Sequence, residues 1–249
     1  MLGGIDMIRA ASYTDQGGRE YNEDACMVVK QDDYLCAIVA DGLGGHGGGK
    51  LASMTAVNAV KECFEAMDPG ADVQASNVCM WFDTANGRVL EMQTRECGMK
   101  TTMALICLKF DADRVLAAHL GDTRIYHFAD GVLSHMSFDH SVSRMAVLAG
   151  EIPMEAIRFH TDRNKLLKAV GKGEDATPEI NELLIDRNIH NAFLICTDGF
   201  WEYVTEEQME ESLCASTTPR EWLEHMCWHI RNTAKVGNDN NTAVAVFVD

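Results

Sequence analysis

Six acidic residues, spread over five separate motifs, are the feature of this sequence that points most directly to chemistry. Each stands beside a glycine or another turn-forming residue. They are Glu23, Asp24, Asp41, Asp122, Asp198 and Asp239. Oxygen-only ligands of this kind favour Mg²⁺ or Mn²⁺, whereas zinc sites usually recruit histidine or cysteine. The set predicts a carboxylate cage for hard divalent cations, and we expect no histidine or cysteine cluster.

The positions of these aspartates at the ends of apolar segments indicate that they converge. Asp41 ends the apolar segment 34–40, and Asp198 ends the apolar segment 193–196. Each has a glycine directly behind it, which lets the backbone approach an ion closely. One turn-forming aspartate would be ordinary, but like charges within about 4 to 6 Å oppose one another's ionisation unless a cation lies between them. The ordered set therefore predicts one metal-binding rim.

A carboxylate cage that holds two metal ions is suited to the hydrolysis of phosphate esters. This reaction is among the slowest known without a catalyst. Two ions about 3.5 to 4 Å apart can deprotonate a bridging water, orient it in line with the leaving oxygen, and absorb charge on the phosphoryl oxygens. Phosphate ester hydrolysis is therefore the chemistry that the acidic set indicates.

The elements that must position the cage are strands joined by short turns, with helices between them. Apolar, β-branched segments predict strands. They are Ala25 to Val29, Tyr34 to Ala40, Thr101 to Lys109, Arg114 to Leu120, Thr123 to Phe128, Glu179 to Ile185, Phe193 to Thr197 and Ala243 to Val248. The polar turns 31–33, 111–113 and 129–131 suit hairpins, which favours antiparallel pairing.

Helical periodicity appears in five further segments. They are Lys50 to Met67, Asp72 to Cys97, Ser141 to Ala149, Thr205 to Ala215 and Pro219 to Thr233. Strands that bury both faces, alternating with helices, predict an α+β fold: a four-layer α-β-β-α sandwich of two mostly antiparallel sheets flanked by helix pairs. The irregular segment 149–164 is expected to form a loop or flap at the site.

Composition narrows the class of protein. No linker divides the 249 residues, so we expect one domain over 1–249. The 38 acidic and 21 basic residues give a net charge of -17, which disfavours nucleic acid and attracts divalent cations and basic peptides. The apolar runs fall short of the roughly 18 residues of a membrane span. The nine cysteines lack disulfide or zinc spacing. We expect a soluble, cytoplasmic monomer without a membrane or nucleic-acid partner.

The motifs that carry the acidic residues are distinctive as an ordered series. They are R-E-Y-N-E-D (Arg19 to Asp24), D-G-L-G-G-H (Asp41 to His46), G-D-T-R (Gly121 to Arg124), T-D-G-F (Thr197 to Phe200) and G-N-D-N-N-T (Gly237 to Thr242). In this order they resemble the metal-dependent Ser/Thr protein phosphatases of type 2C, the PPM family, in its bacterial branch. The resemblance runs from about Ser12 to Val248. It implies the same four-layer sandwich, and Mg²⁺- or Mn²⁺-dependent hydrolysis of phosphoserine and phosphothreonine on proteins phosphorylated by a cognate kinase.

The resemblance implies a ligand set for two core metal ions. Asp41 would bridge them. Glu23 and the carbonyl group of Gly42 would bind one ion, and Asp198 and Asp239 would bind the other. A water molecule that bridges the two ions would be the nucleophile.

Other residues receive roles from the same resemblance. Asp24 would hold metal-bound water, and Asp122 would bind a third, weaker ion together with Asp198. Arg19 would grip the substrate phosphate, for which its planar guanidinium is suited. His46 has the titration range of a general acid for the leaving alkoxide, although a locally packed loop histidine is the alternative.

Two departures from the family pattern stand near these motifs. Lys100-Thr101-Thr102 occupies the place where the family commonly has Gly-Thr-Thr, and Asn241 replaces an apolar residue after Asp239-Asn240. Neither removes a ligand, so we expect an active enzyme. We expect structural roles for His140 and His160.

Three rival interpretations come from other features. The string D-A-D-R-V (Asp111 to Val115) could carry the covalent aspartate of a haloacid-dehalogenase-like phosphatase, but a hairpin tip accounts for it better. Cys214 and Arg220 have the C-x₅-R spacing of cysteine phosphatases, yet the segment lacks glycine and contains Pro219. The third rival, a phosphoprotein-binding or sensing module with little turnover, would be expected to have lost metal ligands.

Overall fold

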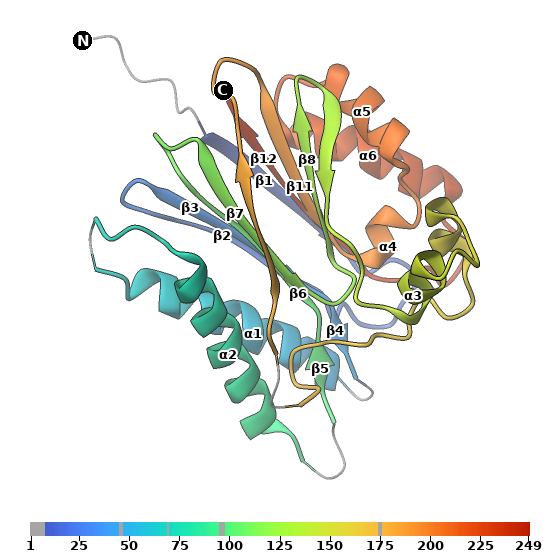
Figure 1. The fold of residues 1–249 in the computed structure, drawn as a ribbon. Helices are drawn as coiled ribbons and strands as arrows, with labels where there is room; N and C mark the ends of the chain where they lie inside the picture. Colours follow the sequence, from blue (N-terminus) through green and yellow to red (C-terminus); the bar gives the residue numbers. More distant parts are fainter. Residues whose placement is uncertain (1–7, 45–46, 69, 95–97, 174–175) are drawn as a thin grey trace.

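Two five-stranded sheets, packed face to face, form the centre of the protein (Figure 1). The structure, a computed structural model, describes residues 8–44, 47–68, 70–94, 98–173 and 176–249. The first sheet contains, in spatial order, β1 (Ile8–Asp15), β12 (Asn241–Val248), β11 (Asn191–Cys196), β8 (Arg124–Ala129) and β9 (Val132–Met136). The second contains β10 (Glu179–Leu184), β7 (Arg114–Leu120), β6 (Met103–Lys109), β3 (Tyr34–Ala40) and β2 (Ala25–Gln31). All of the strand pairs are antiparallel.

The central strands are apolar on both faces because each sheet is covered on both faces. In β3, Leu35, Ala37 and Val39 face the core between the two sheets. Cys36 and Ile38, which alternate with them, face the helices. Since side chains of a strand alternate between faces, a continuous apolar run is what a sheet in the middle of a four-layer structure requires.

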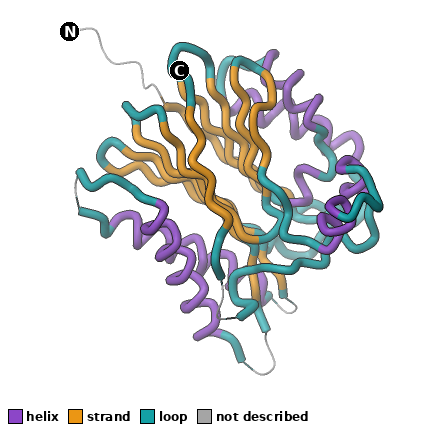
Figure 2. The backbone as a smooth tube through the Cα atoms, viewed as in Figure 1, coloured by secondary structure: helices purple, strands orange, loops and turns teal. Residues whose placement is uncertain are grey.

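Helices cover the outer face of each sheet (Figure 2). The second sheet packs against α1 (Gly48–Glu65) and α2 (Ala75–Met92). The first packs against α4 (Asp198–Trp201), α5 (Glu206–Cys214) and α6 (Pro219–Thr233). The short α3 (Val142–Leu148) and the 3₁₀ helix η1 (Met154–Phe159) lie beside α4 at one end of the sandwich (Figure 1). The α-β-β-α prediction is confirmed.

The sequence of α6 shows why a helix forms there. The Thr218 hydroxyl caps the helix by accepting a hydrogen bond from a main-chain N–H of the first turn, and Pro219 follows at the first helical position. Both are favoured there, because the first N–H groups of a helix have no partner within it. Trp222, Met226 and Ile230, spaced four residues apart, are all buried against the first sheet.

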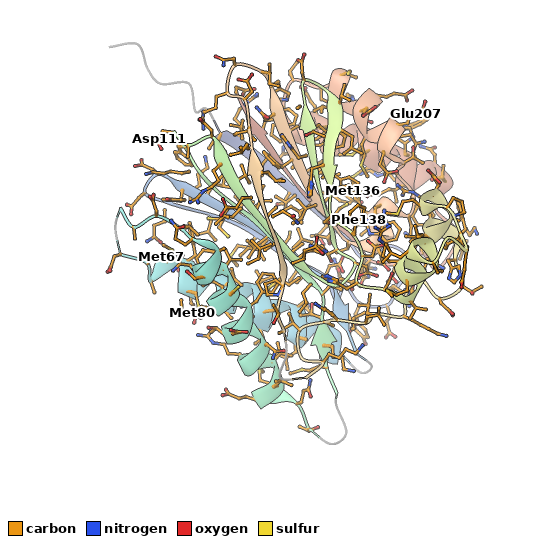
Figure 3. The ribbon with its side chains drawn as sticks, in the orientation of Figure 1. Met67, Met80, Asp111, Met136, Phe138 and Glu207 are labelled. Atoms are coloured by element: carbon orange, nitrogen blue, oxygen red, sulfur yellow. The ribbon has the colours of Figure 1, made fainter. Side chains whose placement is uncertain are left out.

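The predicted polar turns join antiparallel strands. Asp130 and Gly131, between β8 and β9, have φ angles of 51° and 83°, as a two-residue hairpin turn requires. Asp32, between β2 and β3, has a φ angle of 50°. Asp111 lies at the exposed tip of the β6–β7 hairpin, at the edge of the sandwich (Figure 3).

Two edge strands, β1 and β9, were not predicted. Both carry polar residues and are partly exposed, because the edge of a sheet need not be apolar on both faces. The strand predicted over Thr101 to Lys109 is interrupted at Thr102. Its first part, β5 (Lys100–Thr101), instead pairs with β4 (Gly42–Leu43) in a separate two-stranded sheet. No helix within the described ranges has both the length and the apolar character needed to cross a bilayer.

Candidate functional site

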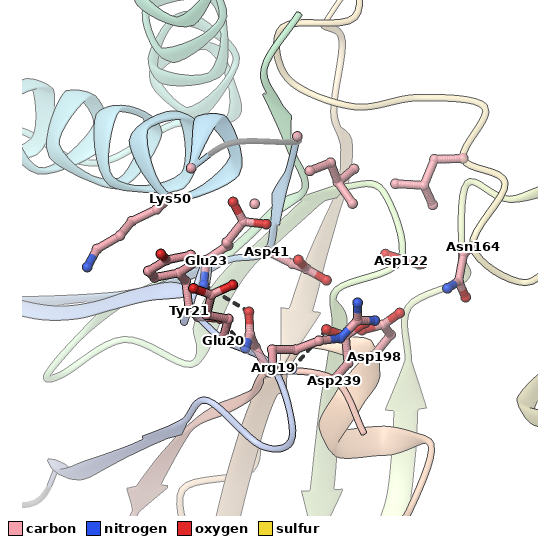
Figure 4. Close-up of a pocket in the computed structure, with 16 residues that line it drawn as sticks. Arg19, Glu20, Tyr21, Glu23, Asp41, Lys50, Asp122, Asn164, Asp198 and Asp239 are labelled. Carbon is pink, nitrogen blue, oxygen red and sulfur yellow. Dashed lines mark hydrogen bonds and ion pairs between the residues drawn. The ribbon is translucent and has the colours of Figure 1, made fainter. Parts of the chain in front are cut away.

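Five of the six acidic residues line one cavity of about 900 Å³ (Figure 4). They are Glu23, Asp41, Asp122, Asp198 and Asp239. The sixth, Asp24, lies beside them, because its carboxylate interacts with Asp41 and Asp239. The structure thus brings together residues that are more than 200 positions apart in the chain.

Sheet topology explains this convergence. β3 and β7 both lie antiparallel to β6, so they run in the same direction, and Asp41 and Asp122 follow their carboxyl ends. β11 and β12 are antiparallel to each other, so Asp198, after β11, and Asp239, before β12, lie at the same end of the first sheet. Each sheet therefore contributes two aspartates to one rim of the sandwich.

Burial and neighbouring negative charges raise the pKa of four carboxyl groups at the site, those of Asp24, Asp41, Asp122 and Asp198. Burial raises the pKa of Asp41 well above its usual range, and the charges of Asp24, Asp198, Asp122 and Asp239 raise it further. Burial and the nearby carboxylates have the same effect on the pKa of Asp198. Burial also raises the pKa of Asp24 to about 7, and that of Asp122 to about 7. Such a cluster stays fully ionised at neutral pH only when cations neutralise it.

Two buried oxygen atoms in the cluster fit a metal site. Oδ1 of Asp24 and Oδ1 of Asp198 have no hydrogen-bond partner among the described residues. A buried polar atom without a partner is costly, and a divalent cation would satisfy an ionised carboxylate oxygen. The donor set, composed of carboxylates and backbone carbonyl groups, is the kind that Mg²⁺ and Mn²⁺ prefer.

A threonine pair fixes the backbone of Asp41. The Thr101 hydroxyl and the Thr102 main-chain N–H both donate to the Asp41 carbonyl oxygen, at 2.7 and 2.9 Å. The Asp41 N–H donates to the Thr102 hydroxyl at 3.0 Å. The first departure from the family pattern thus keeps both threonines. At the second, the buried Asn241 amide donates to the Asp239 carbonyl oxygen at 3.3 Å.

Gly42 and Gly49 allow the start of α1 to approach the site closely. A Cβ atom on Gly42 would lie 2.5 Å from the Glu23 carbonyl oxygen, and it would also clash with the carbonyl of Gly49. A Cβ atom on Gly49 would lie 2.6 Å from the Gly42 carbonyl oxygen and 2.8 Å from the Glu23 carboxyl carbon. Both positions therefore require glycine. Gly42 was predicted for its carbonyl group, whereas the role of Gly49 depends on a tertiary contact that the sequence does not show.

Asn240 connects the N-terminal motif to β12, a role that sequence reasoning missed. Its Oδ1 accepts a hydrogen bond from the Glu23 N–H at 2.8 Å, and its Nδ2 donates to the carbonyl oxygens of Gln16 and Tyr21 at 2.8 and 2.9 Å. The Ser53 hydroxyl donates to the Glu23 carbonyl oxygen at 2.5 Å. These contacts position Glu23 in the cavity. The two consecutive asparagines after Asp239 are the sequence feature that could have indicated this role.

Arg19 lies at the mouth of the cavity. Its Nη2 donates to Oδ2 of Asp239 at 2.7 Å, and 53% of its side chain is exposed. The guanidinium can therefore contact both the carboxylate cage and a ligand that enters the cavity (Figure 4). Its planar fork is suited to two phosphoryl oxygens. His46, the predicted general acid, lies outside the described residues.

A histidine cluster exists, contrary to expectation. Possible ligand atoms of His119, His140 and Glu179 lie within 4.8 Å of one another. The two rings are stacked with centroids 4.6 Å apart, and His119 Nε2 is 2.8 Å from the Phe138 carbonyl oxygen. Lone pairs of imidazole nitrogens lie in the ring planes, so parallel rings cannot both face one ion. Nδ1 of His140 accepts from the Gly121 N–H at 3.2 Å, a structural contact of the kind expected.

The geometry supports neither of the two motif-based rivals. Asp111 lies at a hairpin tip and does not line the acidic cavity. Cys214 is the last residue of α5, and Arg220 lies in the first turn of α6. The main-chain N–H groups of the three residues after Cys214 donate to the carbonyl oxygens of Glu211 and Leu213 and to the Glu221 carboxylate. They are not free to surround a phosphate, so the C-x₅-R spacing is coincidental.

The four-layer fold and its acidic cavity define the class of the protein, an α-β-β-α sandwich with a cluster of carboxylates at one rim. Residues 16–231 match the family described as protein phosphatase 2C, and the chain belongs to this metal-dependent family. The resemblance seen in the motifs is therefore confirmed.

Relatives and solved structures agree with this assignment. The chain is 29% identical to a serine/threonine phosphatase, stp, of Listeria monocytogenes serotype 4b (strain F2365), over 97% of this chain and 96% of that protein. The crystal structure of the serine/threonine phosphatase Stp1 from Staphylococcus aureus superposes with a TM-score of 0.85 at 26% identity, covering 100% and 97% of the two chains. The catalytic domain of the phosphatase PstP, in complex with two manganese ions, superposes with a TM-score of 0.78 at 26% identity, covering 97% and 99%.

Proposed function

We propose that this protein removes phosphate from phosphoserine and phosphothreonine residues of proteins, with Mn²⁺ or Mg²⁺ as its cofactor. One observation carries the proposal: five acidic residues from distant motifs line a single cavity, with Arg19 at its mouth. Membership of the protein phosphatase 2C family supports it. A binding module without turnover is not favoured, because the acidic motif residues are all retained.

The cage residues divide between two core ions in this proposal. Asp41, whose pKa responds to the charges of its acidic neighbours, would bridge the ions. Glu23 and the Gly42 carbonyl group would bind one ion, and Asp198 and Asp239 the other. When bound, such ions neutralise charge on the phosphoryl oxygens and lower the pKa of the attacking water.

Residues around the core ions would handle water and phosphate. Asp24, which accepts a hydrogen bond from the Thr197 hydroxyl at 3.0 Å, would orient water at the cage. Asp122 and Asp198 would hold a third, weaker ion, since the Asp122 charge raises the pKa of Asp198. Arg19 would turn from Asp239 to grip the substrate phosphate with its bidentate fork.

The proposal also includes a general acid, a flap over the cavity, and the organisation of the whole chain. We infer that His46 protonates the leaving alkoxide, and that residues 149–164 act as a flap, since Asn164 lines the cavity. We also infer one catalytic domain over 1–249, acting as a monomer on proteins phosphorylated by a cognate Ser/Thr kinase. The eight described cysteines are all free, which supports a cytoplasmic location.

Hydrolysis of p-nitrophenyl phosphate and of a phosphothreonine peptide tests the proposed function. We expect activity with Mn²⁺, loss of activity with EDTA, and no loss after iodoacetamide. Asp41→Asn should abolish activity, whereas the matched change Asp111→Asn, at the exposed hairpin tip, should not. Activity that persists in Asp41→Asn, or that disappears in Asp111→Asn, would overturn the two-metal proposal.

A further inference from the structure

Lys50 is a second cationic side chain at the acidic cavity. Among the described residues that line the cavity, only Arg19 and Lys50 carry a positive charge. Arg19 is paired with Asp239 at 2.7 Å. Lys50 is exposed, and the ion pairs and side-chain hydrogen bonds found among the described residues do not involve its ammonium group. The lysine is therefore available to a ligand that enters the cavity.

Helix stability does not account for this lysine. Lys50 lies in the first turn of α1, which contains no acidic residue. A positive charge near the N-terminus of a helix is unfavourable, because the helix dipole already places partial positive charge there. Lys61, near the other end of the same helix, lies where a cation is favourable and pairs with Glu65 at 3.7 Å.

The position of Lys50 defines one end of the cavity. In Figure 4, Lys50 and Tyr21 lie at one end of the cavity, and Asp122 and Asn164 lie at the opposite end. Tyr21 is 61% exposed, so its ring offers a flat surface beside the cavity. The carboxylate cage lies between the two ends, so a group held at Lys50 would flank a phosphate held at the cage.

We propose that Lys50 is a specificity-determining residue that binds a second anionic group of the phosphoprotein substrate, with Tyr21 as the adjoining wall. This group is a carboxylate or a second phosphate on a residue close to the phosphoresidue. The inference rests on the proposed phosphatase function and adds a substrate preference to it.

The preference for an anionic group at Lys50 opposes the attraction that the negatively charged protein exerts on basic segments. It acts at shorter range than that attraction. The net charge of -17 attracts basic segments. Charges more than about 8 Å apart are largely screened at physiological ionic strength, so a direct partner decides the preference at one peptide position. We therefore expect an acidic preference at the position that reaches Lys50, surrounded by positions where basic residues are tolerated.

A phosphothreonine peptide series tests this inference. The peptides differ only in having Glu, Gln or Lys at each single position within four residues of the phosphothreonine, and one further set carries a second phosphoserine instead. The wild-type protein with Mn²⁺ should show kcat/KM values roughly fivefold higher for Glu than for Lys at one position, as expected for a surface ion pair. The ratio between the phosphoserine and Glu peptides shows which anion is preferred.

Charge reversal at Lys50 supplies the decisive comparison. Lys50→Glu should invert the order of the Glu and Lys peptides at that position, and Lys50→Gln should remove the difference. Lys61→Glu, on the same helix, makes the same change in net charge and should leave the wild-type order intact. The inference would be overturned if Lys50→Glu and Lys61→Glu changed the ratio of kcat/KM between the Glu and Lys peptides equally. It would also be overturned if the wild type showed no preference at any single peptide position. Hydrolysis of p-nitrophenyl phosphate by the wild type separates this failure from failure of the proposed function.

Discussion

Replacing Asp24 by asparagine should stabilise the protein when metal is removed. Asp24 belongs to the carboxylate cluster, and its Oδ1 atom is buried without a hydrogen-bond partner among the described residues. Its other oxygen accepts from the Thr197 hydroxyl, which an asparagine carbonyl oxygen can also do. The substitution therefore removes one buried negative charge while preserving the known hydrogen bond.

The size of the effect follows from the pKa of Asp24. Burial raises this pKa from its ordinary value of 3.8 to about 7. This difference is about three pKa units, and each unit corresponds to about 1.4 kcal/mol, which gives a penalty on the order of 4 kcal/mol. The carboxyl group ionises first in the unfolded chain, so stability falls as the pH rises from about 4 to 7. The penalty is complete above pH 7 and absent below pH 4.

Thermal unfolding with EDTA at pH 8 and at pH 5, and with Mn²⁺ at pH 8, measures this effect. In EDTA at pH 8, Asp24→Asn should have a Tm several degrees above that of the wild type, because about 1 kcal/mol shifts the Tm of a chain of this size by roughly 2 to 4 °C. At pH 5 the difference should shrink. With Mn²⁺ the variant should gain less stability than the wild type, because it binds the ions more weakly.

A matched control separates the cage from general charge effects. Asp83→Asn removes the same charge from an exposed position on α2, and its Tm should follow that of the wild type under all three conditions. If Asp24→Asn were less stable than the wild type in EDTA at pH 8, the buried Asp24 carboxylate would not carry the ionisation penalty described above.

Three further substitutions test the residues that support the site. Gly49→Ala places a methyl group 2.6 Å from the Gly42 carbonyl oxygen, so Mn²⁺ affinity measured by calorimetry should fall about tenfold; unchanged affinity would show that α1 can shift away. Asn240→Ala removes three hydrogen bonds and should lower the free energy of unfolding, measured in urea, by roughly 2 to 3 kcal/mol. A loss under about 0.5 kcal/mol would show that these bonds do not hold the N-terminal motif in place. Arg124→Met leaves Asp139 without its buried ion-pair partner. The free energy of unfolding should fall by about 3 to 5 kcal/mol, and an unchanged value would refute this pairing.

The strands and the cage were predictable because their signals are local. A continuous apolar run such as 34–40 requires a sheet covered on both faces. One aspartate followed by glycine at the end of such a run would be an ordinary turn, but an ordered series of them indicates a common site. The edge strands β1 and β9 were not predictable in the same way. Each leaves part of its surface exposed, so their sequences lack the apolar pattern of the central strands.

The supporting residues of the site were harder to predict, because their roles come from contacts between distant segments. Asn240 holds backbone atoms of residues more than 200 positions away. Gly49 is required only because α1 begins against the Gly42 backbone. Lys50 looks like an ordinary surface lysine until the fold places it at the acidic cavity. Such residues have no characteristic spacing, and only the tertiary structure identifies them.

Anomalous diffraction from crystals grown with Mn²⁺ tests the central claim most directly. We expect two strong manganese peaks in the cavity, both within coordination distance of the Asp41 carboxylate, with Glu23 on one side and Asp198 and Asp239 on the other. Crystals with no manganese in this cavity, or with manganese only at His119, His140 and Glu179, would contradict it.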